Sequence, residues 1–327
     1  MLPVIAVLIP CHNEEAAIGK VIRDFRAALP LASIFVYDNN SSDRTKEIAL
    51  SAGAVVRTEA LQGKGNVVRR MFADIEADVF VLVDGDDTYD ASSAPKLIER
   101  LLTDSLDMVS ATRVETSHAA YRAGHRLGNS ILTGVVVRIF GNRLSDMLSG
   151  FRVFSRRFVK SFPALASGFE IETELTVHAL ELRLPIAEEP TPYRERPSGS
   201  VSKLRTYHDG LRILRTIAIL VKEERPLQFF SIFFALFAFA SVVLALPIIR
   251  DFLHTGLVPR FPTIILSAAL MLLAFLSLVC GLILDTVTRG RVEAKRLHYL
   301  SIPVRFNPVH GDGAVPALAR ETQARWS

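Results

Sequence analysis

Cysteine is scarce in this chain of 327 residues, which contains only Cys11 and Cys280. Cys11 ends a short apolar run near the N-terminus, and Cys280 lies in a long apolar run far along the chain. This usage excludes a disulfide framework. The eight histidines show no metal-ligand spacing, so we expect no zinc site. Internal repeats and low-complexity tracts are absent from the sequence as well.

A basic segment is missing before the apolar residues 2–10, and this stretch runs into the polar residues His12, Asn13 and Glu14. A secretory signal peptide would carry positive charge ahead of a continuous apolar core. We therefore expect a buried strand here, and an N-terminal part that stays in the cytosol.

Charge is missing from two long stretches, FFSIFFALFAFASVVLALPII at residues 229–249 and TIILSAALMLLAFLSLVCGLIL at residues 263–284. Each is long enough for a helix that crosses the hydrocarbon core, which takes about 20 residues. Half of all residues are apolar, and the mean hydropathy is +0.29. Two buried core helices are the alternative, but such helices are normally shorter and carry a polar face. We expect a two-helix transmembrane hairpin.

Basic residues flank these two stretches, whereas the loop between them holds only Arg250 and Arg260. Because positively charged flanks stay on the cytoplasmic side, we expect an integral inner- or plasma-membrane protein with its N-terminal domain and both termini in the cytoplasm. The net charge of +4 also raises nucleic-acid binding. No nucleic-acid motif is present, and an anionic membrane surface explains the basic clusters better.

The first two hundred residues alternate between short apolar runs and segments of helical spacing. The runs predict strands at residues 4–9, 33–37, 54–57, 79–83 and 107–110, and the spacing predicts helices at residues 43–51, 65–75 and 93–102. Asn13 is predicted to cap a further helix. This alternation predicts an α/β fold with a mostly parallel sheet, in which ligands bind at the carboxyl ends of the strands. Residues 207–224 have one apolar and one basic helical face, typical of a helix in the membrane interface; packing on the N-terminal domain is the alternative.

Acidic loops follow three of the predicted strands. Their sequences are PCHNE at residues 10–14, DNNSSD at residues 38–43 and DGDD at residues 84–87. Carboxylates in Asp-x-Asp spacing can share a hard divalent cation, which then binds phosphate oxygens. The pattern therefore indicates a metal-dependent site for a phosphorylated ligand.

The ordered motifs PCHNE, DNNSSDRT, GKGN at residues 63–66 and DGDD resemble the GT-A fold of glycosyltransferase family 2. With two apolar stretches at the end, the chain is similar to the polyprenyl- and dolichyl-phosphate glycosyltransferases of that family. The resemblance implies a Rossmann-like GT-A domain at residues 1–205, an amphipathic interface helix at 206–227, two transmembrane helices at 228–285 and a cytoplasmic tail at 286–327.

The resemblance also implies roles for donor-binding residues. Pro10 and Glu14 would line the nucleoside, and Asp38 would hold the base or ribose of a nucleotide-diphosphate sugar. Lys64 would approach the diphosphate. Asp84 and Asp86 would bind Mg²⁺ or Mn²⁺, with Asp86 as the main ligand. The chain departs from the family at His12, Asn39, Asn40 and Thr88; we favour a UDP-sugar, and GDP-mannose is the alternative.

On the acceptor side, the resemblance implies that Arg113 in SATRVE and the pair Arg126 and Ser130 in HRLGNS bind the lipid phosphate. A guanidinium suits phosphate because it offers paired donors. Two nearby arginines are alternatives, Arg122 and Arg138. In the family's basic loop, here RPSGSVSK at residues 196–203, Lys203 would stabilise the leaving diphosphate; a plain basic linker is the competing interpretation.

Asp146 in SDMLSGFR and Glu172 in GFEIETEL match positions where related enzymes keep an acid. A phosphate monoester needs no base, because it is largely dianionic at pH 7. We therefore assign Asp146 to positioning, and Glu172 to the donor sugar. The predicted reaction is an inverting transfer that yields a polyprenyl-phosphate monosaccharide.

Two other functions compete with this prediction. A processive polysaccharide synthase would carry Gln-x-x-Arg-Trp and more spans, and the tail holds only QARW at residues 323–326. A non-catalytic nucleotide-sugar-binding membrane module would not need the acidic and acceptor residues together. The partners implied by the resemblance are the nucleotide sugar, the polyprenyl phosphate and the membrane, with a homo-oligomer and a downstream flippase as further possibilities.

Overall fold

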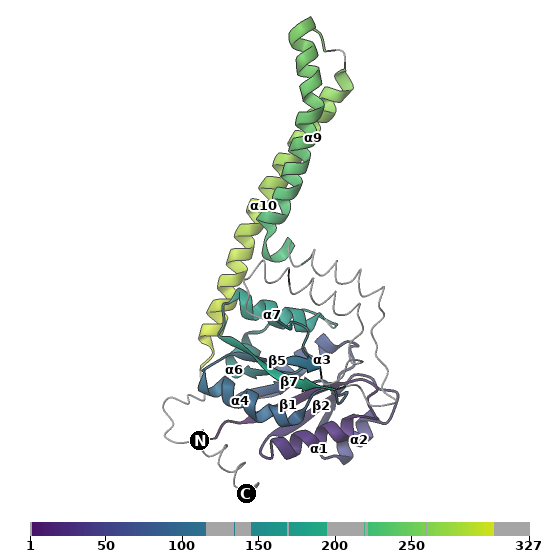
Figure 1. The fold of residues 1–327 in the computed structure, drawn as a ribbon, viewed down its shortest axis with the longest axis vertical. Helices are drawn as coiled ribbons and strands as arrows, with labels where there is room; N and C mark the ends of the chain where they lie inside the picture. The colour runs from purple at the N-terminus through teal and green to yellow at the C-terminus, as the bar shows by residue number, and fades with distance from the viewer. Residues whose placement is uncertain are drawn as a thin grey trace. The chain divides into compact units, whose positions relative to one another are not determined.

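The computed structural model describes residues 2–115, 134, 145–168, 170–194, 219, 222–258 and 260–303. The chain divides into two compact units. The first comprises Met1–Gly210 together with Lys295–Ser327, and the second comprises Leu211–Ala294. Figure 1 shows the α/β elements of the first unit and the long helices of the second.

The first unit contains one seven-stranded sheet among its described residues, in the order β3-β2-β1-β4-β6-β5-β7. The strands are β1 (Ile5–Cys11), β2 (Ser33–Asp38), β3 (Val55–Thr58), β4 (Val79–Leu82), β5 (Met108–Glu115), β6 (Arg152–Ser155) and β7 (Ile186–Tyr193). Strand β6 runs antiparallel to both of its neighbours, and the other pairs are parallel. The mostly parallel α/β sheet predicted from the alternation is therefore confirmed.

Helices connect these strands and cover the sheet. They are α1 (Ile18–Ala28), α2 (Thr45–Ser51), α3 (Lys64–Asp74), the 3-10 turn η1 (Ala91–Ser93), α4 (Ala94–Thr103), α6 (Arg156–Ser161) and α7 (Ile171–Glu181). Helix α1 buries Ile18, Val21, Ile22 and Phe25, which share one helical face. Each such side chain contributes about 1.5–3 kcal/mol when it leaves water. Strand β1 is buried along its whole length. The packed core therefore holds the carboxyl end of β1 in a fixed position.

The start of α1 differs from the prediction. Asn13 does not cap a helix, because α1 begins at Ile18 with Ala17 before it, and no acidic residue lies in its first turn. Asn13 has a left-handed backbone with φ of 53°. Its side-chain oxygen instead accepts a hydrogen bond from the Ser42 N–H at 2.8 Å. The residue thus ties together the loops that follow β1 and β2.

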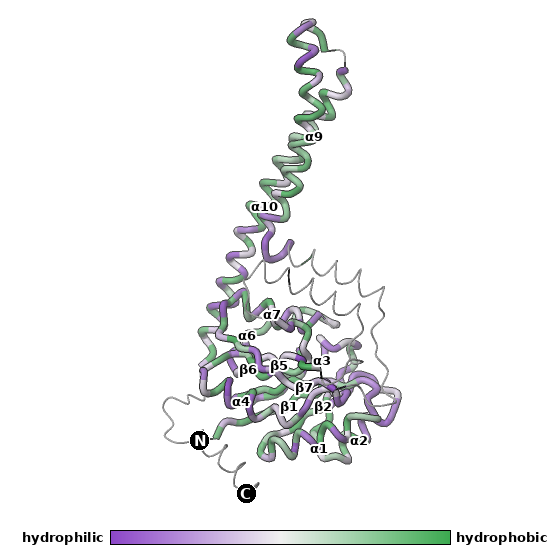
Figure 2. The backbone as a smooth tube through the Cα atoms, in the orientation of Figure 1, coloured by the Kyte–Doolittle hydropathy of each residue, from purple (hydrophilic) through white to green (hydrophobic). Residues whose placement is uncertain are grey.

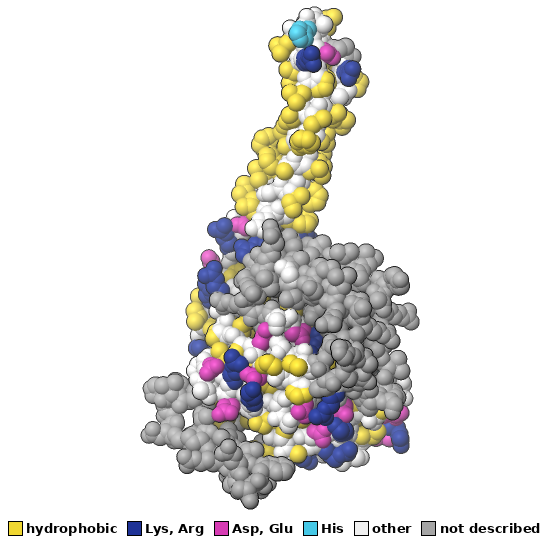
Figure 3. Space-filling view, viewed as in Figure 1, with side chains coloured by type: hydrophobic (Ala, Val, Ile, Leu, Met, Phe, Trp, Pro, Cys, Tyr) yellow, Lys and Arg dark blue, Asp and Glu magenta, His cyan; other side chains and the backbone are white. Residues whose placement is uncertain are grey.

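The second unit contains α9 (Pro226–Thr255) and all but the last residues of α10 (Phe261–Ser301). Both are long and apolar enough to cross a membrane. The Ser241 hydroxyl donates to the Ser267 carbonyl at 2.8 Å, and the Ser267 hydroxyl donates to the Ser241 carbonyl at 2.9 Å. Small polar residues of this kind let two membrane helices approach closely. Figures 2 and 3 show apolar residues along both helices and apolar side chains on their outer surface.

Helix α10 continues beyond the apolar run into residues that we expected in the tail. Its last residues belong to the first unit. There Lys295 forms an ion pair with Glu181 at 2.6 Å, and the Tyr299 hydroxyl donates to Asp107 at 2.7 Å. These contacts attach the end of α10 to α7 and to the start of β5.

Candidate active site

The ends of β1 and β2 lie side by side, because Cys11 pairs with Asp38 in the parallel register. Pro10, predicted at the nucleoside, is buried within β1 opposite Tyr37. Glu14 is 8% exposed, and its N–H donates to the Thr45 hydroxyl at 2.8 Å. The predicted donor residues of the first two loops therefore lie at one edge of the sheet.

Asp38 has an unusual environment for a carboxylate. It is 4% exposed, and its Oδ2 accepts a hydrogen bond from the Ser41 N–H at 3.3 Å. Its Oδ1 is buried without a hydrogen-bond partner among the described residues. Such an atom calls for a donor, because an unpaired buried polar group is costly. A ligand hydroxyl would supply that donor.

Asn39 organises the loop that leads to α3. Its amide donates to the carbonyls of Glu59 at 2.9 Å and Leu61 at 2.8 Å, and its oxygen accepts from the Gly63 N–H at 2.7 Å. An aspartate at this position could not donate to two carbonyls. Asn40 has a φ of 58°, a left-handed conformation that asparagine tolerates better than most residues. The two departures from the family pattern therefore fit the local backbone.

Two glycines flank Lys64 at the start of α3. A Cβ on Gly63 would lie 2.2 Å from the Ser167 carbonyl oxygen, and one on Gly65 would lie 2.2 Å from that of Ala166. The backbone on both sides of Lys64 therefore packs directly against residues 166–167. Only glycine permits this approach.

The ammonium of Lys64 forms ion pairs with the carboxylates of Asp84 and Glu172. Its side chain is 10% exposed. Burial lowers the pKa of Lys64, but the charges and hydrogen bonds of the two carboxylates outweigh burial and raise this pKa overall. Lys64 therefore stays protonated at neutral pH. It links the predicted donor residues Asp84, at the end of β4, and Glu172, on α7, to its own position on α3.

The loop after β4 carries the Asp-x-Asp motif. Asp86 is 4% exposed, and its Oδ1 accepts a hydrogen bond from the Thr88 hydroxyl at 2.6 Å. Burial raises the pKa of Tyr193, and the charges of Asp86 and Asp84 raise it further. Both carboxylates of the motif therefore lie within electrostatic reach of one phenol.

The carboxylates of Asp84 and Asp86 are ligands of the type that Mg²⁺ prefers. Among the described residues, no group of three or more His, Cys, Asp or Glu side chains could hold a metal. Mg²⁺ sites commonly use one or two carboxylates and complete their shell with water and substrate phosphates. One cation, the ammonium of Lys64, already lies against Asp84. The pair of aspartates and a bound diphosphate would therefore form a suitable ligand set.

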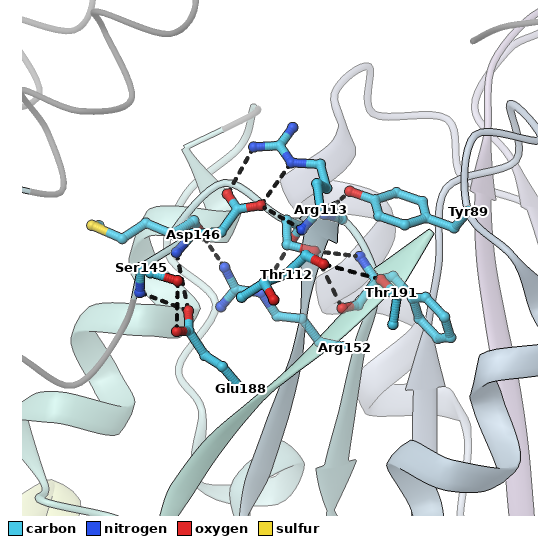
Figure 4. A network of polar contacts seen from close by, with 12 residues as sticks. Tyr89, Thr112, Arg113, Ser145, Asp146, Arg152, Glu188 and Thr191 are labelled. Atoms are coloured by element: carbon cyan, nitrogen blue, oxygen red, sulfur yellow. Dashed lines mark hydrogen bonds and ion pairs between the residues drawn. The ribbon is translucent and has the colours of Figure 1, made fainter. Parts of the chain in front are cut away.

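Arg113 on β5 is held by Asp146. Its Nε and Nη2 donate to the two carboxylate oxygens of Asp146, each at 2.7 Å (Figure 4). The guanidinium also lies over the ring of Tyr193, 5.6 Å from the centroid. Burial raises the pKa of Asp146, but the hydrogen bonds and charge of Arg113 outweigh it and lower this pKa below its usual value. A carboxylate of this kind is a poor proton acceptor.

Three predicted residues lie outside the described part of the chain. They are the acceptor residues Arg126 and Ser130 and the leaving-group residue Lys203. The structure therefore leaves their roles as predictions. The interface helix expected at residues 206–227 also lies mostly outside it.

Three residues near the Asp146–Arg113 pair were not predicted from the sequence: Arg152 and Glu188, which bond the loop that carries Asp146, and Tyr193, whose ring lies under Arg113. Arg152 is 1% exposed, which is rare for an arginine. The motif SDMLSGFR offered one signal for a buried Arg152, because this residue follows the apolar Phe151 where β6 begins. Glu188 and Tyr193 lie on β7, a strand that was not predicted.

Comparison with known proteins agrees with this arrangement. The family model for glycosyl transferase family 2 matches residues 6–162. This chain is similar to glucosyl-3-phosphoglycerate synthase from Mycobacterium tuberculosis, whose crystal structure in complex with Mn²⁺, UDP and glucosyl-3-phosphoglycerate matches it with a TM-score of 0.54 at 25% identity. The match covers 67% of this chain and 79% of the synthase. The first unit therefore has the fold of a GT-A glycosyltransferase.

Three relatives carry the comparison further. An uncharacterized protein of Shigella flexneri is 59% identical over 47% of this chain and 95% of its own length. Glycosyltransferase AglJ of Haloferax volcanii is 34% identical over 69% of this chain and 75% of its own. A dolichyl-phosphate hexose transferase of the same organism is 30% identical over 68% of this chain and 95% of its own. This chain belongs to glycosyl transferase family 2.

Proposed function

We propose that this glycosyltransferase moves one sugar from a nucleotide-diphosphate sugar to a polyprenyl phosphate in the membrane. The observation that carries the proposal is that one chain contains both a sugar-transfer domain and two helices long enough to cross a membrane. A GT-A domain with acidic strand ends is followed by two helices apolar enough to cross a membrane. The similarity to a dolichyl-phosphate hexose transferase over 95% of that enzyme supports a lipid-phosphate acceptor.

The donor is bound, in this proposal, at the ends of β1, β2 and β4. Asp38 offers its buried, unpartnered Oδ1 to a ribose hydroxyl or a base N–H. We favour a UDP-sugar, because the similar glucosyl-3-phosphoglycerate synthase was crystallised with UDP. Pro10 and Glu14 line the nucleoside. Glu172 binds the transferred sugar through its hydroxyl groups.

Asp84 and Asp86 would hold Mg²⁺ or Mn²⁺ together with the donor diphosphate. When bound, such an ion neutralises phosphate charge and favours departure of the diphosphate. Lys64 adds a fixed positive charge beside Asp84. Its ammonium stabilises the negative charge that develops on the leaving diphosphate. Lys203 of the basic loop would contribute in the same way.

The acceptor is the phosphate of the lipid. Arg113 orients it with paired N–H groups, and Arg126 and Ser130 would complete the phosphate site. One phosphate oxygen attacks the anomeric carbon as the bond from that carbon to the diphosphate oxygen breaks, which inverts the configuration. No proton moves, because the attacking phosphate is already dianionic at pH 7. Asp146 acts by holding Arg113 rather than as a base, in keeping with its lowered pKa.

The two helices would keep the site at the membrane surface where the acceptor phosphate lies. The loop between them would lie outside, and the catalytic domain in the cytoplasm, because the flanking segments carry most of the basic residues. This sidedness is testable by the accessibility of engineered cysteines in sealed vesicles.

The test is a transfer assay with the purified full chain in detergent or lipid nanodiscs. A panel of labelled UDP- and GDP-sugars is offered with polyprenyl phosphate and Mg²⁺ or Mn²⁺. One sugar should appear on the lipid for one donor of the panel. A long polymer would indicate a processive synthase instead, and binding without turnover would indicate a non-catalytic module.

A further inference from the structure

The loop of residues 145–150, here called the acceptor loop, touches two parts of the candidate active site. Asp146 holds the guanidinium of Arg113 through two hydrogen bonds of 2.7 Å. At the other end of the loop, a Cβ on Gly150 would lie 2.1 Å from Oδ2 of Asp84. The first part of this loop therefore contacts the acceptor-side arginine, and its last residue packs against a donor-side carboxylate.

Arg152 lies buried beside the acceptor loop, with 1% of its surface exposed. Its guanidinium donates to the carbonyls of Ser149, at 3.0 Å, and Met147. It also donates to the Thr176 hydroxyl of α7 at 2.9 Å. Burial lowers the pKa of Arg152, and the charges of Glu172 and Asp146 oppose this effect. An apolar side chain in its place would leave the two buried loop carbonyls without their donor, so the arginine holds the backbone of the loop.

Glu188 of β7 holds the start of the same loop. Its carboxylate accepts hydrogen bonds from the N–H groups of Ser145 at 2.7 Å and Asp146 at 3.0 Å. The Ser145 hydroxyl donates to it at 2.8 Å as well. In Figure 4, Arg113 lies above Asp146, and Arg152 and Glu188 lie below it. The backbone of the acceptor loop is thus held at its first two residues and at residues 147 and 149.

We propose that Arg152 and Glu188 are positioning residues for acceptor transfer, which fix the acceptor loop so that Asp146 presents Arg113 to the acceptor phosphate. The expected kinetic effect rests on the proposed function. In this proposal neither Arg152 nor Glu188 contacts the substrate. A displacement of about 1 Å in a positioning group can lower turnover about 100-fold.

The first test compares Glu188→Gln with Glu189→Gln in the full chain. Glu189 is the next residue of β7, and its carboxylate pairs with Lys96 and Arg100 instead of the loop. Glu188→Gln should raise the acceptor KM or lower kcat about tenfold, with the donor KM within about twofold of wild type. Glu189→Gln should match wild type. Equal kinetics for the two variants, or a parallel change in both KM values, would overturn the proposal.

Arg152 is tested by Arg152→Lys and Arg152→Met. Lysine keeps the charge but cannot reach the loop carbonyls and Thr176 in a fork. Both variants should show the same acceptor-specific loss at temperatures where they remain folded. If Arg152→Lys restores wild-type acceptor kinetics, the buried charge alone matters and positioning by Arg152 is rejected.

A second measurement needs no substrate, so it separates this proposal from the proposed function. Arg113→Gln is introduced into wild type, Glu188→Gln and Glu189→Gln, and thermal unfolding is recorded. If Glu188 positions Asp146 toward Arg113, the loss of Tm caused by Arg113→Gln should be at least halved in the Glu188→Gln background. The same loss in all three backgrounds would overturn the positioning role whichever acceptor the enzyme uses.

Discussion

Lys64 is bonded to Glu172 across 108 positions of sequence. The ion pair joins the first residue of α3 to the first turn of α7. Asp84 binds the same ammonium from the end of β4. This contact connects three separate segments of the chain at the edge of the sheet where the donor diphosphate would bind.

Replacing Lys64 by methionine should destabilise the fold. The variant leaves the buried carboxylate of Glu172 and the partly exposed carboxylate of Asp84 without the ammonium that pairs with both. Breaking a fully buried pair costs about 3–5 kcal/mol, and the exposure of Asp84 makes the expected loss smaller. Thermal unfolding of the variant and of wild type at pH 8 measures this loss.

Lys46→Met is the matched control for that experiment. Lys46 donates to the Thr58 hydroxyl at 3.2 Å in an exposed position, so its removal should change the unfolding free energy by less than about 0.5 kcal/mol. A Lys64→Met variant as stable as this control at pH 8 would contradict the paired arrangement.

Replacing Asn39 and Asn40 by the residues that the family usually carries should change stability to different extents. Asn39→Asp removes two donated hydrogen bonds and places a charge against two carbonyls, so it should cost about 1–3 kcal/mol and weaken donor binding. Asn40→Gly should cost less, because glycine adopts a φ of 58° without strain, and the change removes an exposed hydrogen bond to the Ala60 carbonyl. Thermal unfolding and nucleotide titration compare them; an Asn39→Asp protein with wild-type stability would refute the account of this loop.

His178 should make the fold sensitive to acid. Burial lowers the pKa of His178 to about 3, and the charge of Lys295 acts in the same direction. In the unfolded chain the imidazole binds a proton below pH of about 6.5. The stability contribution is therefore complete above pH 6.5 and is lost as the pH falls toward 3, by up to about 1.4 kcal/mol per pH unit.

The variant His178→Gln tests this titration, since glutamine carries no titratable group. Its unfolding free energy should decline less steeply than that of wild type between pH 6.5 and 4. The exposed His254 provides a control variant, His254→Gln, that should keep the wild-type slope. Identical slopes for all three proteins would show that another group governs acid sensitivity.

The sequence predicted β1 to β4 and the start of β5 but missed β6 and β7. The apolar residues of the predicted strands identified them. Strand β7 contains two prolines and two glutamates, a composition that argues against a central strand. Among the described strands its neighbour is β5, and it lies at the edge of the sheet, where proline is tolerated. Strand β6 has four residues and begins with a buried arginine. Because arginine is normally exposed, the sequence of β6 does not read as a buried strand.

The candidate site was predicted as separate motifs rather than as contacts. The Asp-x-Asp spacing and the order of strands were enough to place Asp38, Asp84 and Asp86 at one edge of the sheet. Arg113 lies on β5 and Asp146 lies in the loop before β6, so their contact depends on how β5 pairs with β6 and β7. This pairing is a tertiary feature that no local residue spacing encodes.

Asp86→Asn should abolish metal-dependent transfer while the chain stays folded. Asparagine keeps the shape of Asp86 and an oxygen for the Thr88 hydroxyl, but lacks the charge that a divalent cation needs. Calorimetric titration with Mn²⁺ and UDP should show at least about tenfold weaker binding. Asp87→Asn, which alters the ion pair between Asp87 and Lys20, should bind normally. Equal Mn²⁺ binding by the two variants would exclude Asp86 as a ligand.

The central claim is that one sugar is transferred to a lipid phosphate. The most direct measurement is mass spectrometry of the lipid formed by the purified full chain from a nucleotide sugar and polyprenyl phosphate. The account predicts a polyprenyl phosphate that carries a single sugar on its phosphate group. A lipid fraction that remains unmodified with every UDP- and GDP-sugar, or one that carries a polymer, would contradict it.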